Sequence, residues 1–419
     1  MRETRNRTAI LMLVTTALCA PGVASAQQEG EPERNVKVQD RPRPDYDPIG
    51  IRAGSFFFYP SVGLQGLYDS NVLAVDDDEE DDFAAILTPR LQVKSNFSRH
   101  SLALDVGAET ASYLDENDND YQDVYARGAG QLEITRDNLL NGNVTVSRLH
   151  EDRDSPDDTG ADEITIYQNH LLGLNYRRNF ARLFALVGGE LRRFDFGDTD
   201  EVNNDDRDRN QYLARARVGY EVSPRLNGFV EGTVDARRYD ETPDDTGRDR
   251  DSEGYSLRAG ADVDLTGIVF GELSAGYSRR KYDDDALDTV DGLSFGGAVT
   301  WNVTQLTSVV FEGLGEIQET TIVAGGDEAT ANFQKTISVD VTHELLRNVL
   351  LNANAAYIRD DFEGVDRTDN SLLLGGGVSY LLNRNLSLDA TYSFRTRDSD
   401  ESEDEYTRNI VRLGLTAKL

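Results

Sequence analysis

Along most of this chain, apolar and polar residues alternate with a period of two, which is the period of a β-strand. In the segment YSLRAGADVDL (255–265), every odd position is apolar, whereas the even positions include Arg258, Asp262 and Asp264. The segments LSFGGAVTWNV (293–303) and LSLDATYSF (386–394) alternate in the same way. The pattern predicts an all-β protein whose strands have one apolar face and one face that carries full charges.

Two kinds of break separate the strands, and the two kinds alternate along the chain. Short breaks recur every 37 to 45 residues, near Arg99, Asp137, Asn179, Pro224, Gly267, Gln305, Arg347 and Arg384. Long acidic breaks lie between them, at residues 70–82, 115–120, 152–163, 195–210, 240–253, 283–291, 322–330, 360–369 and 398–405. Eight turns and nine loops join eighteen strands. The strand count could differ by two, because three of the strands alternate less cleanly. The strands are long enough to cross a bilayer at a tilt.

The separation of turns from loops distinguishes a membrane barrel from a soluble sandwich. A sandwich does not place every long loop at one end and every tight turn at the other, whereas an up-and-down barrel does. Tyr residues gather beside the long loops and Phe residues beside the short turns, as in the aromatic girdles of bilayer barrels. We therefore predict a transmembrane up-and-down antiparallel β-barrel of about 18 strands at residues 51–419, with long acidic extracellular loops and short periplasmic turns.

The N-terminus has the features of a secretory signal peptide. Arg2, Arg5 and Arg7 precede a short apolar run, and the small residues 24–26 (Ala-Ser-Ala) form a cleavage motif. We expect residues 1–26 to be removed and residues 27–50, a Pro-rich tail, to lie in the periplasm. The only cysteine, Cys19, lies in the signal peptide, so the mature chain would have no thiol chemistry and no disulfide.

The charge of the chain is large and unevenly placed. A formal net charge of −33 disfavours nucleic acid as a partner, because phosphates would be repelled. The nine long breaks together carry −43, so the rest of the chain is net positive. The sequence thus predicts an acidic rim at the extracellular end of the barrel.

The polar strand faces supply the candidates for the lining of the lumen. Alternation places twelve charged residues on that face: Arg127, Glu133, Arg215, Arg217, Asp235, Arg237, Arg258, Asp262, Glu272, Arg280, Arg395 and Arg412. Eighteen strands enclose a space wide enough to need a hydrated lining. These charges either solvate one another and the water, which is the ordinary role of a lumen arginine, or form a selectivity filter.

Motifs of catalysis and of specific metal binding are missing from the sequence. It has no nucleophile elbow, phosphate loop or HExxH motif. His150 precedes Glu151 and Asp152, but by parity with Val144 and Val146 it would point toward lipid. The acidic loops lack the spacing of a calcium loop. We therefore expect no enzyme activity and no cofactor, and at most weak, diffuse binding of Ca²⁺ or Mg²⁺.

Residues 41–72, RPRPDYDPIGIRAGSFFFYPSVGLQGLYDSNV, resemble the start of the Putative beta-barrel porin 2 family of outer-membrane proteins. The shared features are a Pro-rich lead and a YD-x-NV signature formed by Tyr68, Asp69, Asn71 and Val72. The resemblance implies an outer-membrane barrel of a Gram-negative bacterium without catalytic residues. Several members accompany exopolysaccharide export machinery, which implies an exit channel with a periplasmic export partner as one alternative.

Two functions from different classes fit these features. One is a porin that lies in outer-membrane lipid and passes hydrophilic solutes or an exopolysaccharide. The other is a structural or surface-interaction barrel with cation-binding acidic loops and a closed lumen. A hydrolase at the rim is a third hypothesis, which rests on His150 alone.

Overall fold

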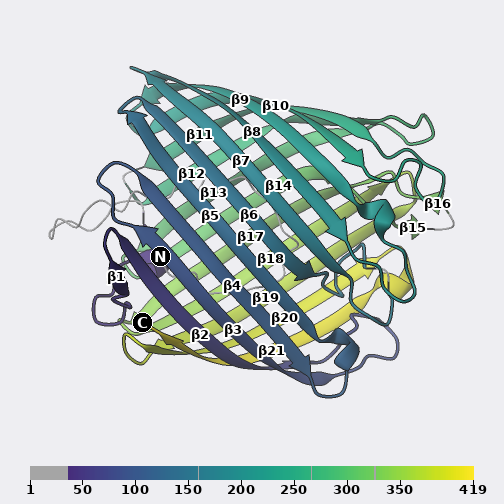
Figure 1. Cartoon of the computed structure of the whole chain (residues 1–419), viewed down its shortest axis with the longest axis horizontal. Coiled ribbons are helices and arrows are strands. Elements are labelled where there is room, and N and C mark those ends of the chain that lie inside the picture. Colours follow the sequence, from purple (N-terminus) through teal and green to yellow (C-terminus); the bar gives the residue numbers. More distant parts are fainter. Residues whose placement is uncertain (1–35, 159, 266, 325–326) are drawn as a thin grey trace.

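The computed structural model describes residues 36–419, except residues 159, 266 and 325–326, and forms one closed antiparallel β-barrel (Figure 1). Its sheet has nineteen strands, of which one, β1 (Ile51–Ala53), is short and pairs only with β2. The eighteen long strands are β2 (Phe56–Asp69), β3 (Asp82–Ser95), β4 (Ser101–Tyr113), β5 (Tyr121–Thr135), β6 (Asn138–His150), β7 (Ile166–Phe180), β8 (Leu183–Phe196), β9 (Arg209–Ser223), β10 (Leu226–Tyr239), β11 (Ser252–Leu265), β12 (Val269–Tyr282), β13 (Val290–Thr304), β14 (Thr307–Gln318), β17 (Ala331–Leu346), β18 (Val349–Glu363), β19 (Arg367–Leu381), β20 (Leu386–Ser399) and β21 (Tyr406–Lys418). The predicted count of eighteen is confirmed.

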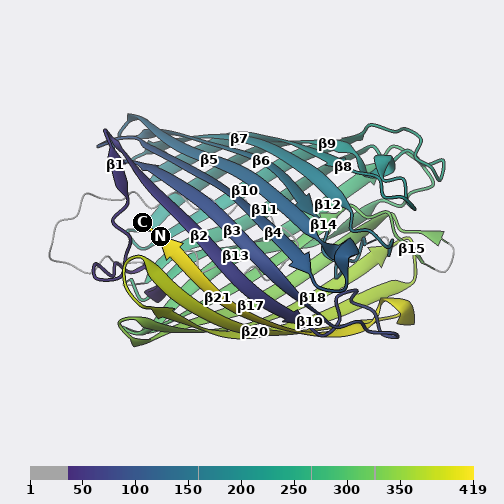
Figure 2. The same ribbon diagram turned by 60° about the horizontal axis from the view of Figure 1, so that its bottom comes forward.

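The first and last long strands close the barrel. β2 pairs with β21 from Ser61 opposite Lys418 to Asp69 opposite Ile410. Every other long strand pairs with its neighbours in the sequence, so the topology is up-and-down throughout. Figure 2 shows β1 and the end of β21 at the same end of the barrel, as an even number of strands requires. Closure leaves no unpaired sheet edge, which a bilayer would penalise.

The remaining elements are small. A two-stranded ribbon, β15 (Val323–Ala324) with β16 (Asp327–Glu328), lies in the loop between β14 and β17. Four one-turn 3-10 helices complete the described part: η1 (Val38–Asp40), η2 (Asn117–Asn119), η3 (Asp205–Arg207) and η4 (Ser402–Asp404). Of these described helices, none has the length and apolar character to cross a membrane.

The two faces of the wall differ as the alternation predicts. Large apolar side chains stay exposed on the outer face, among them Leu132, Val218, Val230, Val234, Leu257, Leu273, Ile337, Leu374 and Leu413. The inner face carries the charged and small residues. Exposed apolar side chains on this scale would be unstable in water but are solvated by lipid tails, so the outer face is the membrane-facing one.

At the long-loop end, two segments turn into the barrel and narrow it. β13 pairs with β14 only as far as Phe295 opposite Gly315, whereas β14 and β17 stay paired up to Gln318 opposite Asn332. The tip of the β14–β17 hairpin therefore separates from β13. It packs inward in an apolar cluster of Tyr282, Leu287, Val290, Ile317, Ala331 and Phe333. The second segment is the loop between β6 and β7, residues 151–165.

At the opposite end, where the turns are short, residues 36–48 fold against the inner wall. Val38 is fully buried, and its N–H donates to Ser308 Oγ at 2.8 Å. Asn302 Nδ2 donates to the carbonyl of Val36 at 3.3 Å. The Arg43 guanidinium is buried and lies 2.7 Å from the Glu344 carboxylate on β17. This part of the predicted tail is thus packed on the barrel, and the predicted signal peptide lies outside the described residues.

Candidate functional site: the lumen

The register places all twelve charged residues named from the sequence on the inner face of the wall. For example, Glu231 on β10 lies opposite Arg217 on β9 and Arg258 on β11. Eight of them line a cavity of about 630 Å³ near the long-loop end: Arg127, Arg215, Asp235, Arg237, Arg258, Arg280, Arg395 and Arg412. The other four do not line this cavity: Glu133, Arg217, Asp262 and Glu272. Their position inside the barrel follows directly from strand parity.

A chain of ion pairs joins β9, β10, β11 and β12 midway down the wall. Arg217 donates through Nε to Glu231 at 2.8 Å and through Nη1 to Glu272 at 2.8 Å. Arg258 donates to the other oxygen of Glu231 at 3.1 Å. Glu231 accepts from arginines on both neighbouring strands, whereas Glu272 on β12 accepts from Arg217 on β9, three strands away. This network neutralises its own charges and stiffens the wall.

The inward hairpin is held by arginines of β10 and β12. Arg237 and Tyr239 on β10 both donate to the carboxylate of Glu319, with Tyr239 Oη at 2.9 Å. Arg280 on β12 pairs with Asp235 and lies 3.7 Å from Glu319. Three of the sequence-named lumen residues, Arg237, Arg280 and Asp235, therefore anchor a loop. Sequence reasoning missed Glu319, because nothing in a loop marks which carboxylate will turn inward.

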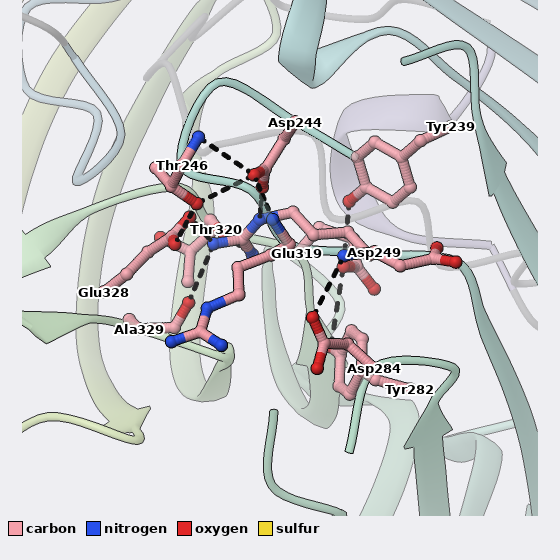
Figure 3. A network of polar contacts seen from close by, with 12 residues as sticks. Tyr239, Asp244, Thr246, Asp249, Tyr282, Asp284, Glu319, Thr320, Glu328 and Ala329 are labelled. Carbon is pink, nitrogen blue, oxygen red and sulfur yellow. Dashed lines mark hydrogen bonds and ion pairs between the residues drawn. The ribbon is translucent and has the colours of Figure 1, made fainter. Parts of the chain in front are cut away.

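A buried arginine clamps the same hairpin from the loop between β10 and β11. Arg250 is 1% exposed and donates to Asp244 at 3.0 Å, to Glu328, and to the carbonyl of Thr320 at 2.8 Å. Figure 3 shows Asp244 and Thr246 beside Thr320 and Glu328, with Tyr239 and Glu319 adjoining. Arg250 also donates to the carbonyl of Ala329 at 3.2 Å, so one buried guanidinium joins four acceptors and holds the hairpin tip in place.

The loop 151–165 crosses the lumen and meets both the far wall and the hairpin. Asp154 accepts from Arg395 on β20 through its carboxylate and from Arg397 through its carbonyl. Asp157 accepts from the hydroxyl of Thr320. At its start, Glu151 forms a bidentate pair with Arg207, at 2.9 and 2.8 Å. The predicted acidic rim is therefore, at this loop, a strap across the inside of the barrel.

Within this loop, Asp158 has a raised pKa. Burial raises the pKa of Asp158 to about 6, although the Arg153 guanidinium, 3.6 Å away, opposes the shift. The neighbouring negative charge of Glu151 adds to the increase. Asp158 therefore changes its charge near neutral pH, in a loop that occupies the lumen.

His150 corrects one expectation from the sequence. It lines the lumen cavity instead of facing lipid, and it stacks on Tyr121 with a ring separation of 3.7 Å. Its Nδ1 lies 3.0 Å from the carboxylate of Asp123. The parity rule failed because β5 pairs with β6 only as far as Val124 opposite Arg148, and beyond it β6 is paired with β7 alone, up to His150 opposite Ile166, where Asp123 binds the His150 ring.

The YD-x-NV signature lies at the seam where the barrel closes. Asp69 on β2 is fully buried and paired with Arg408 on β21 at 2.6 Å. Asn71 Nδ2 donates to the carbonyls of Val75 at 2.6 Å and Thr407 at 3.1 Å. Val72 is buried and Tyr68 packs on Phe83. These residues join the first strand to the last one.

The acidic loops were the candidates for metal binding. In the part of the chain that the structure describes, no three carboxylate, imidazole or thiol groups come together as ligands for a metal ion. The acidic run 76–82 is divided: its first six side chains are exposed, whereas Asp82 is buried and accepts from the N–H groups of Asp115 and Glu116 at 3.0 and 2.9 Å. Asp82 fixes a neighbouring loop.

An apolar outer face, a closed wall and a charged lumen define this protein as a transmembrane β-barrel with a polar interior. The family model described as Putative beta-barrel porin 2 matches residues 43–419, and the chain belongs to this family. This confirms the resemblance seen in the N-terminal signature.

Solved structures from Pseudomonas aeruginosa and Acinetobacter baumannii are similar to the chain over most of its length. OccK2 (OpdF) of Pseudomonas aeruginosa is 11% identical, with a TM-score of 0.47 and coverage of 87% of this chain and 97% of that chain. OccAB4 of Acinetobacter baumannii is 12% identical, with a TM-score of 0.44 and coverage of 90% and 100%. OpdL of Pseudomonas aeruginosa is 12% identical, with a TM-score of 0.43 and coverage of 88% and 99%. No curated protein matches the chain significantly.

Proposed function

We propose that this protein is a passive channel for hydrophilic solutes in the bacterial outer membrane, in keeping with its family. The observation that carries the proposal is the polar cavity of about 630 Å³ inside a closed barrel whose outer face is apolar. A lumen lined by ion pairs is wetted, and water-filled barrels of this size conduct small solutes. No step of this function needs a cofactor or a catalytic residue.

The orientation follows the usual convention for such barrels. The long acidic loops lie outside the cell and the short turns lie in the periplasm. Residues 36–48 would then lie at the periplasmic mouth, after export by the signal peptide and its removal. The acidic loops give the outer mouth a negative potential, which raises the local concentration of cations and lowers that of anions.

The lumen geometry favours small solutes over polymers. The strap 151–165 and the inward β14–β17 hairpin occupy the outer half, and residues 36–48 pack at the other end. An exopolysaccharide would have to displace all three, whereas we expect a small solute to pass beside them. We therefore place the small-solute channel first, and the barrel with a closed lumen remains the alternative that the experiment must exclude.

Ion conductance and solute flux test the proposal directly. Purified protein, shown to be folded by its heat-dependent mobility on a denaturing gel, would be inserted into planar bilayers and into liposomes. Discrete conductance steps and liposome swelling with small sugars are the expected results. Folded protein that is electrically silent and passes no sugar would overturn the channel function and favour a structural barrel.

A further inference from the structure

The lumen cavity has a row of arginines on one side whose charge is incompletely compensated. Arg209 and Arg215 on β9 and Arg192 on β8 follow one another down the wall, since Arg192 lies opposite Gln211. Among the described residues, Arg209 and Arg215 have no carboxylate within ion-pair distance. Arg209 donates to the carbonyl of Arg207 at 2.7 Å, and Arg215 donates to Asn175 Oδ1 at 2.9 Å. Arg192 forms an ion pair with Glu190 on its own strand, with 3.2 Å between Nη2 and Oε1.

These guanidinium groups retain donors for a ligand. Arg215 uses one nitrogen for Asn175, and Arg209 is otherwise surrounded by aromatic rings, with Phe194 at 4.7 Å and Tyr239 at 5.8 Å. The aromatic faces stabilise the cation without neutralising it. A carboxylate is the group that satisfies the fork of donors on an arginine.

A carboxylate without a cationic partner lies on the other side of the same cavity. Glu316, near the inward tip of β14, has one contact in the described structure, a distant one of 3.5 Å with Gln318 Nε2. The arginines that act on its charge are Arg237, Arg258 and Arg192, and none of them is within ion-pair distance among the described residues. Asp360, two strands away on β18, differs from Glu316 in that its Oδ1 accepts from Asn332 and Gln334 at 2.7 and 2.8 Å. Glu316 therefore has both carboxylate oxygens available to a cationic group.

The arginine row and Glu316 together disfavour both simple anions and simple cations. A simple anion must pass the acidic loops and then meets Glu316, whereas a simple cation meets the arginine row. A solute with one carboxylate and one ammonium group has no net charge to be repelled at the rim, and it satisfies both sides at once. We propose that the cavity between Arg192, Arg215 and Glu316 is a binding site for small zwitterions of the amino-acid type. This inference rests on the proposed channel function.

The test compares two isomers, alanine and lactamide, in a liposome swelling assay at pH 7. They contain the same atoms, but alanine is a zwitterion and lactamide is uncharged. With dilute solutes, we expect alanine to enter about two- to tenfold faster than lactamide, because a site inside a channel raises flux below saturation. The advantage should be lost in Arg215→Gln and in Glu316→Gln, while the lactamide rate stays the same.

A matched control and the possible failures keep this test separate from that of the channel itself. Arg90→Gln removes another lumen arginine, paired with Asp105 on β4 at 2.5 Å but outside the cavity, and should leave the alanine advantage unchanged. Equal rates for the two isomers in the unmodified protein, or an advantage that survives both variants, would overturn the zwitterion site alone. Failure of both isomers to enter would overturn the channel function as well.

Discussion

Nη2 of Arg43 lies 2.7 Å from Oε2 of Glu344, and this ion pair joins residues 301 positions apart in the sequence. It fastens the segment that precedes the barrel to the inner face of β17. Both side chains are buried, and the Arg43 guanidinium also donates to the carbonyl of Val38 at 2.8 Å. The docked segment therefore depends on a charge pair that is shielded from water.

Replacing Glu344 with Ala should release residues 36–48. The substitution leaves Arg43 buried without its partner, which costs about 3–5 kcal/mol of docking free energy. Trypsin should then cut after Lys37 much faster than in the unmodified protein. Arg347→Ala serves as the control, because Arg347 contacts the same Glu344 at 3.4 Å but is more than half exposed, so its loss should cost less than about 1 kcal/mol. Equal cleavage in the two variants would contradict the role of the buried pair.

Replacing Arg250 with Met should loosen the inward hairpin. Met fills a similar volume but leaves the Asp244 carboxylate and the Thr320 carbonyl without their donor. The expected cost to the docked hairpin is about 3–5 kcal/mol, measured as faster amide hydrogen exchange in residues 319–330. Arg238→Met is the control. Arg238 lies 3.0 Å from the carboxylate of Glu253, whose side chain is exposed, so the loss of this pair should cost little. Unchanged exchange in Arg250→Met would show that the clamp is not needed.

The docked strap 151–165 should become less stable as the pH rises through about 6. The pKa of Asp158 in the docked strap, about 6, lies above its ordinary value of 3.8, so the docked state binds the proton more tightly than the released one. The resulting stabilisation is fully present below pH 3.8 and is lost above pH 6, and it amounts to at most about 3 kcal/mol.

Hydrogen exchange of residues 152–158, corrected for the intrinsic pH dependence, measures this effect. We expect stronger protection at pH 5 than at pH 7.5 in the unmodified protein. Asp158→Asn should remove the difference, whereas Asp81→Asn, at an exposed position of another loop, should preserve it. A pH dependence that persists in Asp158→Asn would assign the effect to another group.

Replacing Gly276 with Ala should weaken the pairing of β11 with β12. A Cβ atom at Gly276 would clash with the backbone oxygen of Leu257, which cannot move without distorting the ladder. Overpacking of this kind costs about 1–3 kcal/mol, which would lower the temperature at which the barrel loses its folded mobility on a gel. Gly228→Ala is the control, because no atom lies within 4 Å of its Cβ position. If both variants lose their folded mobility at the same temperature, the close approach at Gly276 does not limit the stability of the barrel.

The sequence alone determined the wall of this protein. Strand number, closure, the membrane-facing side and the inner position of residues such as Arg217, Arg258 and Glu272 all follow from one local rule, the alternation of side chains along a strand. The YD-x-NV signature also revealed the family. The rule fails at His150, because the pairing of β6 with β5 has ended there and a contact with Asp123, not the ladder, sets the direction of the ring.

Only the tertiary structure decided what fills the barrel. The strap, the inward hairpin and the docked segment are fixed by contacts such as Asp154 with Arg395 and Thr320 with Asp157, which link residues far apart in the chain. Loops have no period, so an acidic loop that turns inward has the same composition as one that stays in water. Ring closure brings the distant partners together, and the cost of leaving any of these buried charges unpaired then holds the loops in the inward position.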